Sequence, residues 1–138
     1  MLKKGRRKKV VLLIDDKLEV IQTLRQLLQD NFSVIEVYDI KEAIDILNNL
    51  TNFPCINVIV TDDDMPYMRG AYLIRALGVS PWRYYIPTIL YTQKEYGVIT
   101  MTLENGCRKW MHPKFQSAEK GKISIVADKV YELCSIYN

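Results

Sequence analysis

The residues best suited to chemistry are two groups of aspartates, each placed directly after an apolar run. Asp15 and Asp16 follow Val10–Ile14, and Asp62–Asp64 follow Ile56–Thr61. Carboxylates this close must take up a proton, face solvent or share a cation. Mg²⁺ prefers carboxylate and other oxygen ligands, so a divalent metal site accounts for both groups. The competing interpretation is that Asp15 and Asp16 only cap the following helix.

The apolar pattern that must position these acids alternates between short continuous runs and residues spaced three and four apart. Short runs are typical of strands buried on both faces, and the wider spacing is typical of amphipathic helices. The strand predictions are 10–14, 33–38, 56–61, 88–92 and about 108–111. The helix predictions are about 17–30, a helix capped by Asp39 and Glu42, about 70–77, about 94–104, and about 123–136.

Five strands alternating with five helices indicate an α/β fold with a parallel sheet covered on both faces. In such a sheet a ligand site lies beyond the carboxyl ends of the strands. The first strand ends at Asp15 and Asp16, the third at Asp62 and the fourth at Thr92, while the fifth runs into His112. If the first and third strands are neighbours, the two groups of acids face one crevice.

Composition indicates one soluble domain. The chain has 138 residues, of which 49% are hydrophobic and 25% charged, and no stretch approaches the roughly 20 apolar residues of a membrane helix. We therefore expect a cytoplasmic protein without membrane insertion. The three cysteines, an odd number without metal-ligand spacing, are interpreted as free thiols in a reducing compartment.

A basic segment begins the chain, because six of the seven residues Lys3–Lys9 are Lys or Arg. We predict a basic tail over residues 1–9 and a single domain over 10–138. Such an arm can contact phosphate backbones. The preferred interpretation is a solvated tail, so nucleic acid is not an expected partner except through Lys3–Lys9.

Four stretches, read together, resemble the receiver domain of two-component response regulators. They are "VVLLIDD", "VIVTDDDMPYMRG", "PTILYT" and "GCRKWMHPKF", which recur in order and at family-like spacing over residues 10–137. The resemblance implies a flavodoxin-like, doubly wound, five-stranded parallel sheet of order 2-1-3-4-5 with five helices.

The resemblance also implies roles for the acids. Asp62, three residues before the Met of "MP", corresponds to the phosphoacceptor, a carboxylate that forms an acyl phosphate. Asp16 and Asp62 would ligate Mg²⁺ by carboxylate, Asp64 by its backbone carbonyl, and Asp15 through a water. Asp63 would be a bystander.

The remaining site residues include two departures from the family pattern. Thr92 matches the family's switch residue, which hydrogen-bonds the phosphoryl group. His112 stands where the family has a nearly universal Lys, and imidazole is cationic only part of the time near neutrality. Lys109 or Lys114 offers an alternative cation. Gln93 follows Thr92, where the family favours a small residue.

Three functions remain open from the sequence. The first is a receiver phosphorylated by a sensor histidine kinase or a histidine phosphotransfer protein, with no separate enzymatic turnover. Its output would be a downstream protein or a homodimer, through the face formed by residues 94–136. The second is a degenerate receiver that binds proteins without phosphorylation, which His112 and Gln93 favour. The third is a magnesium-dependent hydrolase, for which no general base is evident.

Overall fold

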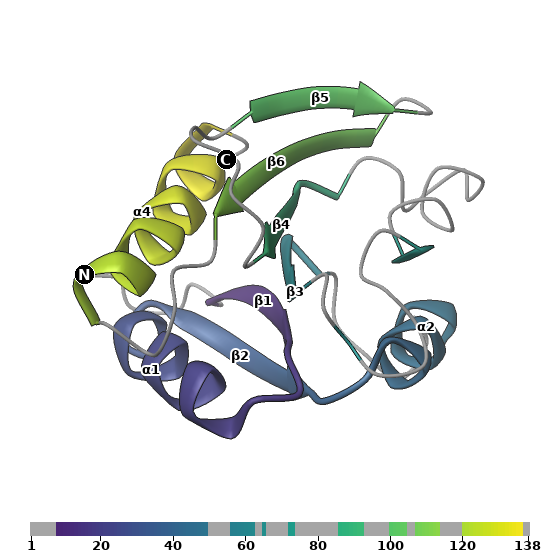
Figure 1. Ribbon diagram of the computed structural model, residues 1–138, viewed down its shortest axis with the longest axis horizontal. Coiled ribbons are helices and arrows are strands. Elements are labelled where there is room, and N and C mark those ends of the chain that lie inside the picture. Colours follow the sequence, from purple (N-terminus) through teal and green to yellow (C-terminus); the bar gives the residue numbers. More distant parts are fainter. Residues whose placement is uncertain are drawn as a thin grey trace.

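The computed structural model describes residues 8–49, 56–62, 65, 72–73, 86–92, 100–104, 107–113 and 120–136. Figure 1 shows the arrangement of its helices and strands. The strands are β1 (Lys9–Ile14), β2 (Phe32–Val37), β3 (Val58–Asp62), β4 (Thr88–Thr92), β5 (Thr100–Glu104) and β6 (Cys107–Pro113). The helices are α1 (Leu18–Leu28), α2 (Ile40–Asn48) and α4 (Lys120–Ile136), and Tyr72 and Leu73 are also helical.

The described strands form one sheet of order β2-β1-β3-β4-β6-β5. Every neighbouring pair from β2 to β6 is parallel, and β5 alone runs antiparallel, beside β6. The predicted order 2-1-3-4 is therefore confirmed, and β6 occupies the place predicted for the fifth strand. The described part of the sheet has six strands, one more than predicted, and the additional strand lies at its edge.

The helix predicted over about 94–104 is wrong for its last five residues, which form β5. Two signals in the sequence explain the strand. Val98, Ile99, Thr100 and Thr102 are β-branched, which favours strands over helices. The two residues between the paired Glu104 and Cys107 are Asn-Gly, the strongest short hairpin signal. Residues 94–99 lie outside the described residues, as does most of the predicted helix 70–77.

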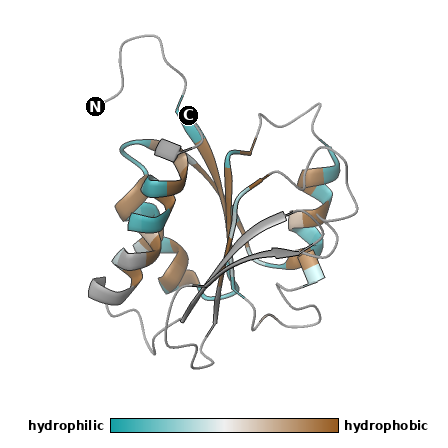
Figure 2. Ribbon diagram, turned by 90° about the horizontal axis from the view of Figure 1, so that it is seen from above, coloured by the Kyte–Doolittle hydropathy of each residue, from teal (hydrophilic) through white to brown (hydrophobic). Residues whose placement is uncertain are grey.

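Helices cover the two faces of the sheet, as Figure 2 shows. Alternate residues of β1 enter different cores, because successive side chains of a strand point to opposite faces. Val11 and Leu13 pack with α1 and α4, whereas Val10, Leu12 and Ile14 pack with α2. This burial on both faces confirms the prediction made from the continuous apolar run.

An asparagine sets the register of β1 against β3 at the amino end of the sheet. The Asn57 backbone N–H donates to the Val10 carbonyl at 2.9 Å, and the Val10 N–H donates to the Asn57 Oδ1 at 2.7 Å. The side chain thus takes the place of a backbone acceptor. Because a slip of one residue would exchange the two faces of a strand, this pair also protects the two cores.

Helix ends are satisfied by side chains in three places. The Asp39 carboxylate accepts from the Glu42 N–H at 2.7 Å, which confirms the predicted cap of α2. The Lys8 ammonium donates to the Gln29 carbonyl after α1, and the Lys9 ammonium to the Cys134 carbonyl near the end of α4. Positive charge is favourable at both places, because helix carbonyls there carry partial negative charge.

Cys134 is a free thiol buried in the core shared by α1 and α4. Burial raises the pKa of the Cys134 thiol, and the nearby Lys9 charge only partly opposes that effect. A buried, protonated thiol is a poor nucleophile. For this cysteine, a structural role agrees with the sequence interpretation. No helix among the described residues is both long and apolar enough to cross a membrane.

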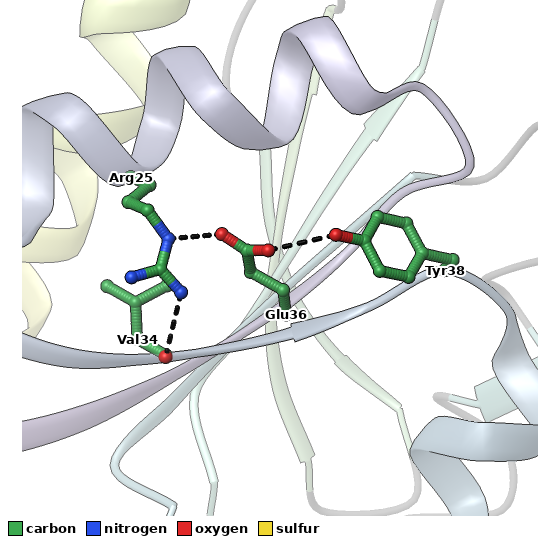
Figure 3. A network of polar contacts seen from close by, with 4 residues as sticks. All are labelled: Arg25, Val34, Glu36 and Tyr38. Carbon is green, nitrogen blue, oxygen red and sulfur yellow. Dashed lines mark hydrogen bonds and ion pairs between the residues drawn. The ribbon is translucent and has the colours of Figure 1, made fainter.

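A polar network joins α1 to the edge strand β2 (Figure 3). The Glu36 carboxylate accepts from the Arg25 guanidinium, with which it forms an ion pair, and from the Tyr38 hydroxyl at 2.9 Å. Partial burial raises the pKa of the Glu36 carboxyl. The hydrogen bonds from Arg25 and Tyr38 and the Arg25 charge together outweigh burial, so the pKa lies below its ordinary value of 4.5.

We predict that this network stabilises the fold at neutral pH and not in acid. A carboxyl whose pKa is lowered by folding contributes stability above its unfolded pKa, and that stability is lost as pH falls through the folded value. Glu36→Gln should cost about 0.5 kcal/mol at neutral pH, a small value because Arg25 is 41% exposed. Urea unfolding should show this difference shrinking below pH 4.5.

Asp45→Asn is the control, because Asp45 is an exposed carboxylate on α2 outside this network. A stability difference for Glu36→Gln that stays constant from neutral pH into acid would contradict the assignment.

Candidate functional site

The register of β1 and β3 brings the two acidic groups together at the carboxyl end of the sheet. Ile14 lies opposite Thr61 in this parallel pair. The next residue of each strand is an aspartate, Asp15 after Ile14 and Asp62 after Thr61. The two aspartates therefore occupy neighbouring positions at the carboxyl ends of adjacent strands, where parallel sheets bind ligands.

Carboxylate oxygens of Asp15, Asp16 and Asp62 all lie within 4.8 Å of one another. Asp15 and Asp62 are fully buried, whereas Asp16 is exposed. The cluster thus has two carboxylates in the protein interior and a third at the surface, through which a ligand from solvent can reach it. The predicted convergence of Asp15, Asp16 and Asp62 is observed.

The turn between β1 and α1 orients Asp15. Its backbone N–H donates to the Val37 carbonyl at 3.1 Å, which continues the pairing of β1 with β2 beyond the end of β1. Its carboxylate accepts from the Lys17 N–H at 2.8 Å. Lys17 is the N-cap residue of α1, and its side chain makes no capping hydrogen bond. Asp15 therefore stabilises the turn that leads into the helix.

The donor set of this cluster fits a hard divalent cation. Three carboxylates supply oxygen ligands only, which Mg²⁺ prefers over nitrogen or sulfur. Close carboxylates repel one another, and the repulsion is largest for buried groups. A cation among them would lower that cost.

The other predicted site residues lie on the neighbouring strands. Tyr91 of β4 is opposite Asp62 on one side and opposite His112 of β6 on the other. Asp62 and His112 therefore share one row across the sheet, two strands apart, which is about 10 Å between backbones. Thr92, the last residue of β4, pairs with Pro113 in the next row. Asp63 and Asp64 lie outside the described residues.

Tyr91 is a position that the sequence analysis did not select. Its place between Asp62 and His112 depends on the strand order, which pairs β4 with both β3 and β6. No local signal in the stretch "PTILYT" singles out Tyr91, because the register of β4 against its neighbours depends on segments distant in the chain.

Comparison with known proteins agrees with the fold. The family model described as response regulator receiver domain matches residues 11–119. That span is most of the chain and contains both acidic groups. The chain belongs to the response regulator receiver domain family, and thus to the receivers of two-component signalling. No individual curated protein gives a match.

Solved structures share this fold at low sequence identity. The chemotaxis response regulator CheY4 of Vibrio cholerae superposes with a TM-score of 0.66 and 19% identity, covering 90% of this chain and 99% of that one. A receiver domain of a signal transduction histidine kinase from Syntrophus aciditrophicus gives 0.68 and 24%, covering 92% and 90%. The Mn²⁺-bound response regulator Rcp1 gives 0.69 and 19%, covering 86% and 88%.

Removing the exposed carboxylate should stabilise the metal-free protein. We expect Asp16→Asn to raise the free energy of unfolding by on the order of 1 kcal/mol in a chelator, because one like charge leaves the cluster. Thermal unfolding with and without the chelator measures this change.

Asp30→Asn provides the control, because Asp30 is exposed in the turn after α1 and is not part of the cluster. A metal-free Asp16→Asn protein less stable than the unmodified chain would show that the carboxylates do not repel one another.

Proposed function

We propose that the chain is a phosphorylatable receiver that accepts a phosphoryl group on Asp62. The observation that supports this proposal most directly is the mutual approach of three carboxylates within 4.8 Å, one of them Asp62 at the end of β3. The phosphodonor would be a phosphohistidine of a sensor histidine kinase or of a histidine phosphotransfer protein. The chain would act as a switch and catalyse no separate turnover.

The proposed step exchanges one bond at phosphorus for another. A carboxylate oxygen of Asp62 forms a bond to phosphorus as the N–P bond of the donor phosphohistidine breaks. The electron pair of that bond stays on the imidazole nitrogen of the donor. The product is an acyl phosphate on Asp62, and no oxidant or further reactant is required.

Asp15, Asp16 and Asp62 would hold Mg²⁺ for this step, with the backbone carbonyl of Asp64 as a further ligand from the resemblance. When bound, the metal neutralises negative charge that otherwise repels the incoming phosphoryl oxygens. Asp15 and Asp62 are buried at the ends of two paired strands, which fixes the positions of their backbones. Asp16 is exposed, so a donor from solvent would reach the cluster on its side.

The switch would run through Thr92 and the strands beyond it. The Thr92 hydroxyl would hydrogen-bond the phosphoryl group. Since Thr92 pairs with Pro113 at the end of β6, a change there can pass into the edge hairpin. Residues 94–136 are the proposed surface for a downstream protein or a second copy.

A second candidate function is a degenerate receiver that binds a partner without phosphorylation. The observation that favours it is His112 in β6, in the same row as Asp62, where the family has a permanent cation. Under this proposal the chain keeps the fold and the acidic cluster, but Asp62 is not phosphorylated efficiently.

The first prediction for this site is a single phosphoryl adduct on Asp62. The full chain incubated with Mg²⁺ and acetyl phosphate should gain the mass of one phosphoryl group, measured on the intact protein. The adduct should be labile to base, because an acyl phosphate hydrolyses readily. Asp62→Asn removes the nucleophile and should abolish the adduct, as should a chelator.

Asp45→Asn, which changes an exposed carboxylate on α2, is the matched control and should retain the adduct. An adduct that persists in Asp62→Asn would place the phosphoryl group on another residue. A chain that binds Mg²⁺ but forms no adduct with acetyl phosphate or with a phosphohistidine donor would favour the degenerate receiver.

The two candidates also differ in the expected effect of His112→Lys. If the missing cation limits phosphorylation, Lys should raise the rate of adduct formation by about tenfold or more, because a positioned cation stabilises the charge of the transferring group. Time courses of intact mass measure this rate. Equal rates in the two proteins would show that His112 does not limit phosphorylation.

A further inference from the structure

The edge strand β5 distinguishes this sheet from the five-stranded sheet that the sequence predicted. Among the described strands β5 pairs with β6 alone, and Figure 1 shows it at the outer edge of the sheet. A strand at an edge presents backbone N–H and C=O groups to any further strand that fits.

The hairpin register identifies which backbone groups of β5 face outward. Glu104 pairs with Cys107 across the two-residue loop, and a tight turn of this length joins the C=O of the first to the N–H of the second. Opposite residues in an antiparallel strand pair alternate between hydrogen-bonded and non-hydrogen-bonded pairs. Thr102, opposite Lys109, therefore bonds to β6, and the backbone groups of Met101 and Leu103 face outward.

The composition of β5 leaves this edge without the usual protection. Natural edges carry charged residues or proline within the strand. The other edge, β2, has the charged Glu36 inside the strand, paired with Arg25. Within β5 the residues Thr100–Leu103 are uncharged, and its only charged residue, Glu104, is the last.

We propose that β5 is a homodimer interface, in which two copies pair antiparallel about a two-fold axis at Thr102. This register lets Met101 of one copy and Leu103 of the other exchange both backbone hydrogen bonds, and the symmetry repeats the exchange. It also places Met101 opposite Leu103 as an apolar pair and Thr100 opposite Glu104, so the two Glu104 residues do not face each other. In this register, two copies of β5 match each other in their backbone hydrogen bonds, in their apolar residues and in the placement of their charges.

The proposal gives Thr102 a specific place. Its own backbone groups face β6, so Thr102 and its copy form a non-bonded pair on the axis, with Cα atoms about 4.5 Å apart. This separation lies within the range of about 4.4–6.8 Å that a disulfide bridges.

The first test is therefore Thr102→Cys in the full chain. Under a mild oxidant it should form a disulfide-linked dimer of twice 16.1 kDa, reversed by a reductant. Ser33→Cys is the matched control, because Ser33 is an exposed residue of the other edge strand. The unmodified chain, with its three native cysteines, gives the background. Cross-linking of Thr102→Cys no greater than that of Ser33→Cys would overturn the proposal.

The second test examines the register with a pair of double variants. Met101→Lys with Leu103→Lys places like charges opposite each other across the axis, and Met101→Lys with Leu103→Glu places opposite charges there. Light scattering over a concentration series should show loss of the dimer in the first variant and a dimer in the second. Equal dimer content in the two variants, or a monomeric unmodified chain throughout the series, would overturn the proposal. Both tests use the unphosphorylated chain, so their outcome is separate from that of the Asp62 adduct experiment.

Discussion

Repulsion among the carboxylates at the ends of β1 and β3 is the constraint on which the site depends. Asp15 and Asp62 occupy neighbouring positions because Ile14 lies opposite Thr61, and both are fully buried. Burying like charges costs free energy unless a cation or hydrogen bonds compensate. The Lys17 N–H that donates to the Asp15 carboxylate offsets part of this cost, and a cation that neutralises the acids would gain affinity from the relief of what remains.

The rest of the fold supplies this stability at a distance from the acids. The apolar residues of β1 pack into both cores, so a shift of β1 would disturb both faces of the sheet. At the amino end of the sheet, Asn57 pairs with Val10 through backbone and side chain. Lys9 binds the end of α4 through the Cys134 carbonyl. These contacts maintain the register that places the acids together at the carboxyl end of the sheet.

The acidic cluster and the departure from the predicted fold lie on different strands of the described sheet. The cluster is built at the ends of β1 and β3, which are neighbours. The antiparallel strand β5 lies at the edge beyond β6, whose His112 shares a row with Asp62. The two regions are joined by the parallel pairing of β3 with β4 and of β4 with β6, so they belong to one continuous sheet.

The amino-acid sequence by itself determined the elements whose signal is local. The apolar run of β1, the cap of α2 at Asp39 and the boundaries of β4 follow from neighbouring residues, and the structure has them as predicted. The Asn-Gly dipeptide between Glu104 and Cys107 is also a local signal, and it favours the observed hairpin over the helix predicted there. Only the tertiary structure decided that Asp15 is as buried as Asp62 and that Tyr91 lies between Asp62 and His112. Strand neighbours and register come from packing between segments distant in the chain, and no local pattern specifies them.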